Sequence, residues 1–196
     1  MSMSRIKRLF WSIILTLRFG NGQSTANFIR KYHLYGSVGK DCLIMKRKLP
    51  LYSNLVFLHD NVIVGSDVGF VTHDGVHFML NKNYLFEKDT FIEKIGCIEV
   101  MDNVFIGSGT RILYNTRIGS NVIIGSDSLV TKDIPDNSVY AGVPARFICS
   151  FDEYVSKHKK YSEEFKKKFG RDAVKGIDDE LASSIYEDFK KQRINN

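Results

Sequence analysis

The chain contains little proline, no paired cysteines and no long apolar run. There are 3 prolines and 3 cysteines among its 196 residues. So little proline argues against a disordered or collagen-like protein. Cys42, Cys97 and Cys149 are odd in number, widely spaced and free of any CxxC pair. Neither a disulfide framework nor a zinc cluster is therefore predicted, and a reducing cytoplasm is the simplest location.

The most apolar stretch, Leu9 to Leu17, follows the basic residues Arg5 to Arg8 and superficially resembles a signal peptide. No small-x-small cleavage site follows it. Ser12 and Thr16 interrupt the run, which falls well short of the ~20 apolar residues that a spanning helix needs. We therefore predict no transmembrane segment.

The remaining composition is that of one soluble globular domain with small appendages. Hydrophobic residues make up 43% of the chain and charged residues 26%, and this length is enough to bury one core. The 28 Lys and Arg outnumber the 22 Asp and Glu, for a net charge of +6. That charge suits an anionic partner, such as a phosphorylated cofactor, an anionic glycan, nucleic acid or a lipid surface.

The strongest pattern is an internal repeat of six residues. An aliphatic side chain recurs at every sixth position, and a small or β-branched side chain recurs four positions after most of them. The aliphatic set is Val100, Ile106, Ile112, Ile118, Ile124 and Val130, and the second set is Val104, Thr110, Thr116, Val122, Ser128 and Ile134. The same step runs backwards through Leu58, Val64 and Phe70, and more weakly through Val38 and Ile44.

This period disfavours a helix and predicts a triangular solenoid of parallel strands. Each hexad supplies one short strand and one corner, three hexads complete a coil, and both sets of side chains point inward. The corners must turn tightly, which favours glycine or a short polar residue with access to positive φ. Examples are Gly107-Ser108, Gly119-Ser120-Asn121 and Gly125-Ser126-Asp127.

The repeat divides the chain into three parts. We expect an N-terminal helical segment over residues 1–35, the solenoid over 36–148 and a C-terminal helical extension over 149–196. The extension has aromatic residues at helical spacing after Ser150-Phe151-Asp152-Glu153, which fits a capping box. Residues 74–99 interrupt the hexads and are predicted to form a long protruding loop, a candidate for substrate binding.

The closing hexads carry a resemblance to a known family. Asn121 to Pro135, followed by Val139-Tyr140-Ala141-Gly142-Val143-Pro144-Ala145-Arg146, resembles the last coil of the hexapeptide-repeat acyltransferases. The similar branch contains galactoside, maltose and polysaccharide O-acetyltransferases. The resemblance implies a left-handed parallel β-helix, acetyl-CoA as donor, and a homotrimer with active sites between subunits.

Acyl transfer to a hydroxyl needs a base of near-neutral pKa, and histidine is the usual choice. His73, in Thr72-His73-Asp74-Gly75, lies where the regular coil breaks into the loop. The resemblance implies that His73 is the catalytic base. Asp74 is either a turn residue or an orienting group, Asp60 is a candidate orienting carboxylate from one coil earlier, and His77 is expected to shape the acceptor pocket.

The resemblance also implies a donor site. It places Ser126 along the pantetheine groove, Thr131 and Lys132 near the adenine and phosphate end, and Arg146 beside the nucleotide phosphates. A flexible ammonium and a guanidinium suit phosphate groups. Members of the family often carry Asn where this chain has Val143, so a side-chain contact from that position is not expected.

These residues favour an acetyl-CoA-dependent O-acetyltransferase that acts on a sugar hydroxyl in capsule or O-antigen synthesis. The leading alternative is N-acetylation of a nucleotide-linked amino sugar. A zinc carbonic anhydrase-like enzyme and a non-catalytic scaffold are further alternatives. We expect no metal and no nucleic acid. The N-terminal stretch is expected to cap the open end of the β-helix, or to make a peripheral membrane contact through residues 5–19 at the inner face of the membrane.

Overall fold

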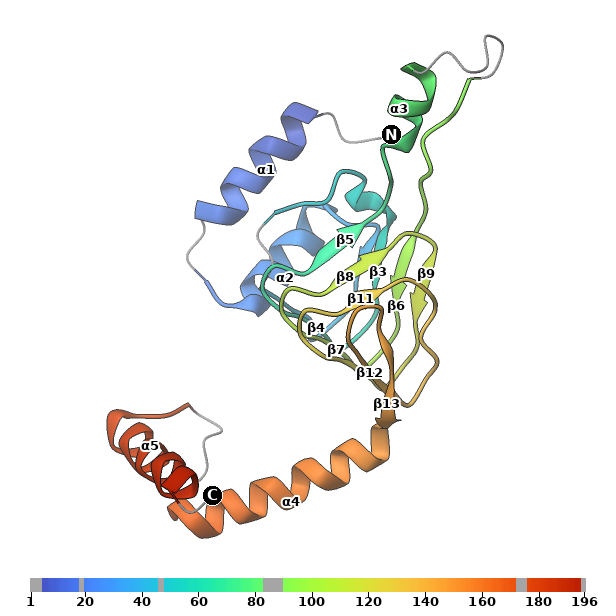
Figure 1. The fold of residues 1–196 in the computed structure, drawn as a ribbon. Helices are drawn as coiled ribbons and strands as arrows, with labels where there is room; N and C mark the ends of the chain where they lie inside the picture. Colours follow the sequence, from blue (N-terminus) through green and yellow to red (C-terminus); the bar gives the residue numbers. More distant parts are fainter. Residues whose placement is uncertain (1–4, 18–19, 46–47, 83–89, 172–175, 195–196) are drawn as a thin grey trace. The chain divides into compact units, whose positions relative to one another are not determined.

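The computed structural model describes residues 5–17, 20–45, 48–82, 90–171 and 176–194. Its internal contacts divide the chain after Phe151 into two units, which are described separately. The first unit is a β-helix of stacked coils with two helices at its N-terminal end (Figure 1). The second unit holds two helices.

Three parallel sheets run along the β-helix, and each complete coil supplies one strand to each sheet (Figure 1). The first sheet contains β1 (Ser37–Val38), β3 (Val56–Leu58), β6 (Ile98–Val100) and β9 (Thr116–Ile118). The second contains β2 (Leu43–Ile44), β4 (Val62–Val64), β7 (Val104–Ile106), β10 (Val122–Ile124), β12 (Ser138–Ala141) and β13 (Arg146–Ser150). The third contains β5 (Gly69–Val71), β8 (Arg111–Leu113) and β11 (Leu129–Val130). Only the terminal pair, β12 with β13, is antiparallel among these strands of the described chain.

The core consists of the two inward sets that the repeat predicts. Every residue of both sets, from Val100 to Ile134, is at most 3% exposed. Equivalent positions pair in register between coils, so that Val104 lies beside Val122 and Ile106 beside Ile124. Such stacks of aliphatic side chains remove nearly all of their apolar surface from water, which is the main favourable contribution to folding.

The corners turn on short polar residues, as predicted, whereas the predicted glycines Gly107, Gly119 and Gly125 do not have positive φ. Positive φ falls mainly on Asn and Asp, whose short polar side chains tolerate that conformation. At the corner between the first and second sheets these are Asp41, Asn61, Asn103, Asn121 and Asn137, with φ from 55° to 59°. Gly107 and Gly119 are needed for another reason, because a Cβ would lie 2.4 Å from the Ser126 nitrogen and 2.6 Å from the Asp136 nitrogen, respectively. They let successive coils approach closely.

The same corner carries a ladder of asparagine side chains. Asn61 Nδ2 donates to Asn103 Oδ1 at 2.9 Å. Asn103 Nδ2 donates to Asn121 Oδ1 at 3.1 Å, and Asn121 Nδ2 donates to Asn137 Oδ1 at 2.8 Å. Each rung therefore joins one coil to the next outside the core.

The N-terminal segment forms two helices, α1 (Arg5–Leu17) and α2 (Gly22–Lys31). The side chain of Asn21 caps α2 by accepting from the Ser24 N–H at 2.9 Å. Phe28 and Ile29 of α2 are buried, and the helix contacts β1 and β2 of the first coil. This segment thereby covers that end of the core. No helix in the part of the chain that the structure describes has the length and apolar character required to span a bilayer.

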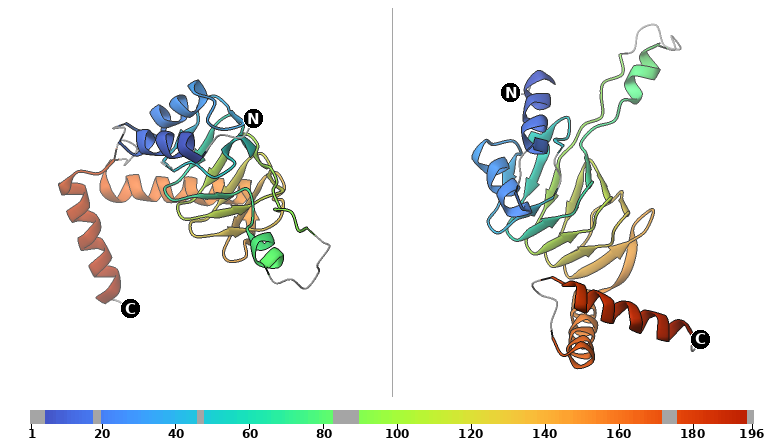
Figure 2. Two further views of the ribbon diagram at one scale, coloured as in Figure 1. Left: turned by 90° about the horizontal axis from the view of Figure 1, so that it is seen from above. Right: turned by 90° about the vertical axis from the view of Figure 1, so that its left-hand side faces the viewer.

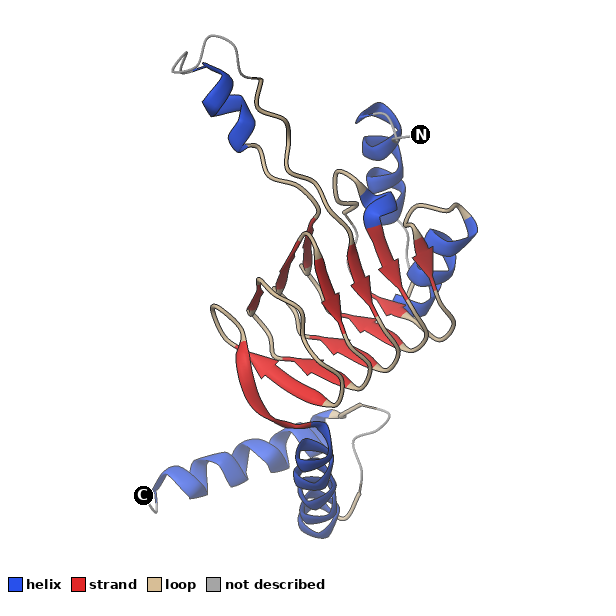
Figure 3. Ribbon diagram, turned by 90° about the vertical axis from the view of Figure 1, so that its right-hand side faces the viewer, coloured by secondary structure: helices blue, strands red, loops and turns tan. Residues whose placement is uncertain are grey.

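The predicted loop is a protruding arm that leaves the coil after β5 (Figure 3). It contains α3 (Val76–Lys82), and its base is an antiparallel ladder. His73 pairs with Ile95, the Asp74 N–H donates to the Lys94 carbonyl at 3.0 Å, and the Gly96 N–H donates to the Thr72 carbonyl at 3.0 Å. The chain rejoins the coil at β6, so residues 98 and 99 belong to a strand and not to the arm.

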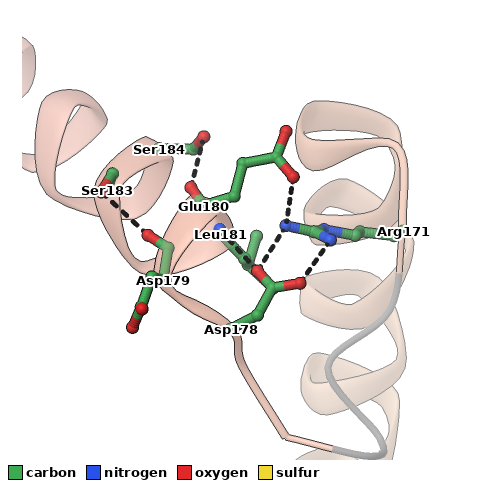
Figure 4. A network of polar contacts seen from close by, with 7 residues as sticks. All are labelled: Arg171, Asp178, Asp179, Glu180, Leu181, Ser183 and Ser184. Atoms are coloured by element: carbon green, nitrogen blue, oxygen red, sulfur yellow. Dashed lines mark hydrogen bonds and ion pairs between the residues drawn. The ribbon is translucent and has the colours of Figure 1, made fainter.

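The second unit contains α4 (Phe151–Phe169) and α5 (Asp179–Ile194). Arg171 forms a two-pronged ion pair with Asp178 at 2.8 and 2.9 Å (Figure 4). Asp178 also accepts from the Leu181 N–H at 2.9 Å, which caps the start of α5. This backbone hydrogen bond, with the help of Arg171, lowers the pKa of Asp178.

Candidate active site

His73 lies at the base of the arm, directly after the buried Thr72. Its half-buried ring packs edge-on against Tyr52, with ring centroids 5.3 Å apart. The Tyr52 hydroxyl donates to Glu93 Oε2 on the returning side of the arm at 2.5 Å. This hydrogen bond to Glu93 raises the pKa of Tyr52. Tyr52 therefore connects the ring of His73 to the returning side of the arm.

The Nδ1 atom of His73 is buried and has no hydrogen-bond partner within the described chain. The Nδ1 atom of His77 is also buried and has no hydrogen-bond partner within the described chain. The His77 ring packs on Phe78, with ring centroids 4.0 Å apart. Buried polar atoms in proteins are nearly always paired. The accessible nitrogen of the His73 ring is therefore Nε2 and not Nδ1.

Asp74 holds the arm in place. Its Oδ2 accepts from the Tyr114 hydroxyl at 2.7 Å, and its Oδ1 accepts from the Val76 N–H at 3.2 Å. The Tyr114 hydrogen bond is the main cause of a lowered pKa for Asp74, and it raises the pKa of Tyr114 in return. Both carboxylate oxygens are thus engaged with groups other than His73.

Asp60 lies at another corner of the triangle, between the first and second sheets. Its Oδ1 accepts from the Lys40 N–H at 2.7 Å, and its own N–H donates to Asp102 Oδ1 at 2.9 Å. His73 follows the third sheet. The structure does not bring the two together within one chain, and the carboxylate of Asp60 has a structural task in joining adjacent coils.

Three residues near His73 are absent from the sequence predictions: Tyr52, Glu93 and Tyr114. Tyr52 and Glu93 belong to segments where the hexads are interrupted, so no periodic position marks them. Tyr114 had a usable signal. Because Val71 pairs with Leu113 in the third sheet, the next residue on each strand, Thr72 and Tyr114, arrives at the same edge.

Three of the four predicted donor residues line one pocket. Thr131, Lys132 and Arg146 surround a cavity of about 300 Å³, together with Tyr140 and Phe147. Lys132 and Arg146 are exposed and place two positive charges there, beside the negative charge of Asp133. Ser126 is not part of this lining, because it lies exposed at the corner between the second and third sheets.

The candidate base and the pocket share an edge of the β-helix. Phe70, Ile112 and Val130 pair in register across β5, β8 and β11. The residues that follow these strands, His73 on one coil and Thr131 with Lys132 two coils later, leave the third sheet at the same side. Neighbouring strands are about 4.8 Å apart, so the two coils are separated by roughly 10 Å.

The histidines do not converge on a metal site in the described ranges, which hold no group of three or more His, Cys, Asp or Glu residues that could bind a metal ion. His59 Nε2 instead lies 3.1 Å from Glu99 Oε1. Arg117 Nη2 lies 2.7 Å from Glu99 Oε2. The His59 hydrogen bond, followed by Arg117, lowers the pKa of Glu99.

Residues 98–132, which include β6 to β11, match the family model described as bacterial transferase hexapeptide (six repeats). Protein CapG of Staphylococcus aureus is 41% identical to the chain over 123 residues, which are 61% of this chain and 69% of CapG. The chain belongs to the hexapeptide-repeat acyltransferase family. It falls in the O-acetyltransferase branch, as its closing coil predicts.

Two further comparisons show a similar sequence and a similar fold. The galactoside O-acetyltransferase of Escherichia coli is 41% identical over 94 residues, which are 47% of this chain and 43% of that enzyme. A solved galactoside acetyltransferase in complex with coenzyme A superposes with a TM-score of 0.60 at 24% identity, over 78% of this chain and 82% of that one. This solved structure has the same fold as the hexapeptide-repeat β-helix described above.

Proposed function

We propose that the protein transfers the acetyl group of acetyl-CoA to a sugar hydroxyl, in the synthesis of a surface polysaccharide such as capsule or O-antigen. One observation carries the proposal: His73 and Lys132 follow strands of the third sheet at the same edge, and Lys132 lines a pocket together with Arg146. A general base and a phosphate-binding site are the two parts that this reaction requires. The likeness to a galactoside O-acetyltransferase favours a sugar hydroxyl as the acceptor.

In the proposed reaction, His73 removes the proton of the acceptor hydroxyl as its oxygen attacks the thioester carbonyl. Because Nδ1 is buried, Nε2 takes this proton. The new C–O bond forms, the C–S bond breaks, and the proton passes to the departing CoA thiolate. Tyr52 fixes the plane of the imidazole by its edge-on contact, and Asp74 keeps the arm's base against the third coil through Tyr114.

The donor's nucleotide end would bind in the pocket of Thr131, Lys132 and Arg146. The guanidinium and ammonium groups are suited to the pyrophosphate and 3′-phosphate of CoA. The pantetheine arm would then extend past Ser126 or along the third-sheet edge towards His73. Holding both substrates in this way converts a bimolecular encounter into an oriented reaction.

We further propose a homotrimer of left-handed β-helices in the cytoplasm, with each active site completed by a neighbouring subunit. Membership of the hexapeptide-repeat family supports this arrangement, because a homotrimer is typical of that family. Three free cysteines, of which Cys42 and Cys149 are buried, fit a reducing compartment.

The proposal is tested by acetyl transfer from radiolabelled acetyl-CoA to a panel of sugars, nucleotide-sugars and oligosaccharides. The full chain is compared with His73→Ala. The matched control is His158→Ala, the same substitution on the exposed surface of α4. We expect an alkali-labile ester product whose rate of formation falls about 10²–10⁴-fold in His73→Ala and not in the control.

Two results would overturn the proposal. Undiminished turnover in His73→Ala would remove the assigned base. An alkali-stable amide formed only with amino sugars would replace O-acetylation by N-acetylation.

A further inference from the structure

Helix α1 has two apolar faces, and only one of them is packed. Leu15 is 2% exposed, and Trp11 and Ile14 pack against the core. The opposite side of the helix presents apolar side chains that are half or more exposed. They are Ile6, Leu9, Phe10, Ile13 and Leu17, with exposures of 82%, 63%, 56%, 50% and 70%. Their spacing of 3, 1, 3 and 4 residues places all five on one face of a helix.

The charge of the chain is concentrated around this helix. Residues 1–48 contain ten Lys or Arg and one acidic residue, Asp41, for a net charge of +9. The whole chain is +6, so the other 148 residues together carry −3. Helix α1 itself contains Arg5, Lys7 and Arg8 and no acidic residue.

A groove of about 390 Å³ runs beside the exposed face. Its walls are apolar side chains of α1, among them Leu9 and Ile13, together with the buried Leu49. Arg8 and Lys48 also line it. The groove therefore combines an apolar floor with two cations, which is the pattern that an amphiphile with an anionic headgroup would match.

A second copy of this chain is a poor occupant for the face. It would bring another +9 region into contact with the first, and like charges across an interface oppose association. An anionic surface would instead be attracted. The helix has 13 residues, and at 1.5 Å per residue it is about 20 Å long, too short to cross the hydrocarbon core.

We propose that α1 docks the protein on an anionic lipid bilayer and lies in the plane of the interface. Ile6, Leu9, Phe10, Ile13 and Leu17 enter the boundary between headgroups and acyl chains. Lys7 lies at the border of this face, and the groove lined by Arg8 and Lys48 accommodates the anionic part of a lipid. The arm that carries His73 projects from the same end of the β-helix as α1 (Figures 2 and 3). The active site would thereby be presented near the bilayer surface. The docking proposal stands on α1 alone and does not depend on the reaction proposed above.

The test is flotation of the full chain with vesicles of phosphatidylcholine, alone or with about 30% phosphatidylglycerol. We expect binding to the anionic vesicles that weakens steeply between low and high salt. Ile13→Glu should lower the partition coefficient at least tenfold, because it places a charge in the apolar face. The matched control is Ile177→Glu, the same change at a position that is 59% exposed in the second unit. Arg8→Gln should weaken binding about fivefold on anionic vesicles only.

Any one of four results would overturn the docking proposal. The first is absence of binding to anionic vesicles. The second is equal binding by wild type and Ile13→Glu. The third is self-association through this face, seen as a smaller assembly of Ile13→Glu in light scattering. The fourth is release of the protein from anionic vesicles by inorganic phosphate as effectively as by competing vesicles. That result would show a simple anion site and no bilayer contact. Acetyl transfer to a soluble acceptor should be unchanged in Ile13→Glu, so failure of docking and failure of the catalytic proposal are distinguishable.

Discussion

The asparagine ladder allows the contributions of backbone conformation and hydrogen bonding to be separated at one position. Asn103 lies in the middle of the ladder, accepts from Asn61 and donates to Asn121. Its φ is 59°. Asn103→Ala removes both hydrogen bonds and places an alanine in the left-handed region. Asn103→Gly removes the same hydrogen bonds but suits the left-handed conformation.

The expected magnitudes follow from these contacts. Two exposed side-chain hydrogen bonds contribute about 1–2 kcal/mol in total. Left-handed backbone costs alanine about 1 kcal/mol more. Asn103→Ala should therefore lower the free energy of unfolding by about 2–3 kcal/mol. Asn103→Gly should lower it by about 0.5–1 kcal/mol less than alanine does, because the greater freedom of glycine in the unfolded chain offsets part of its advantage.

Urea unfolding followed by tryptophan fluorescence measures this difference. The single tryptophan, Trp11, packs against Phe28 and Tyr32 in the unit that contains the ladder. Asn137→Ala is the matched control, because Asn137 has a φ of 57° but only one ladder hydrogen bond among those described. It should cost less than Asn103→Ala. If Asn103→Gly were as destabilising as Asn103→Ala, the assignment of left-handed strain to this corner would be wrong.

Three further predictions concern the core, the arm and the donor pocket. Ile112→Ala, at a position that is 0% exposed, should cost about 2–5 kcal/mol of unfolding free energy, and a cost below 1 kcal/mol by urea titration would contradict the packed core. Tyr114→Phe should raise the pKa of Asp74 towards its ordinary value, as measured by NMR titration. Because that pKa is lowered in the folded protein, its stabilisation is present at neutral pH and is lost as the pH falls below about 4, so the variant should lose stability less steeply there. Arg146→Ala should raise the KM for acetyl-CoA about tenfold, and an unchanged KM would exclude it from the donor site.

The coils could be predicted from the sequence because their core is periodic. Each inward side chain is repeated six residues later in the same environment. The burial of Ile106, Ile112 and Ile118 is therefore predicted by one pattern. The corners were harder to assign. A glycine in a repeat can be required either for positive φ or for close approach between coils. The structure shows that Asn121 has the positive φ at this corner and that Gly119 allows the close approach.

The candidate site was predictable where it follows the repeat. The position of His73 at the end of a third-sheet strand follows from the residue at which the hexads stop. The pocket brings Thr131 and Lys132 together with Arg146 because the last coil folds back through β13. Contacts made by Tyr52 and Glu93 depend on how the two sides of the arm pair, and the sequence carries no period there. Asp60 lies on the same coil as His73, between β3 and β4, and this corner is a different one from the corner that follows β5.

The central claim is that His73 is the base for acetyl transfer from acetyl-CoA to a sugar hydroxyl. The most direct measurement is the rate at which wild type, His73→Ala and His158→Ala form labelled ester from acetyl-CoA and an accepting glycan. We expect a loss of about 10²–10⁴-fold in His73→Ala alone. Equal rates in all three proteins would contradict it.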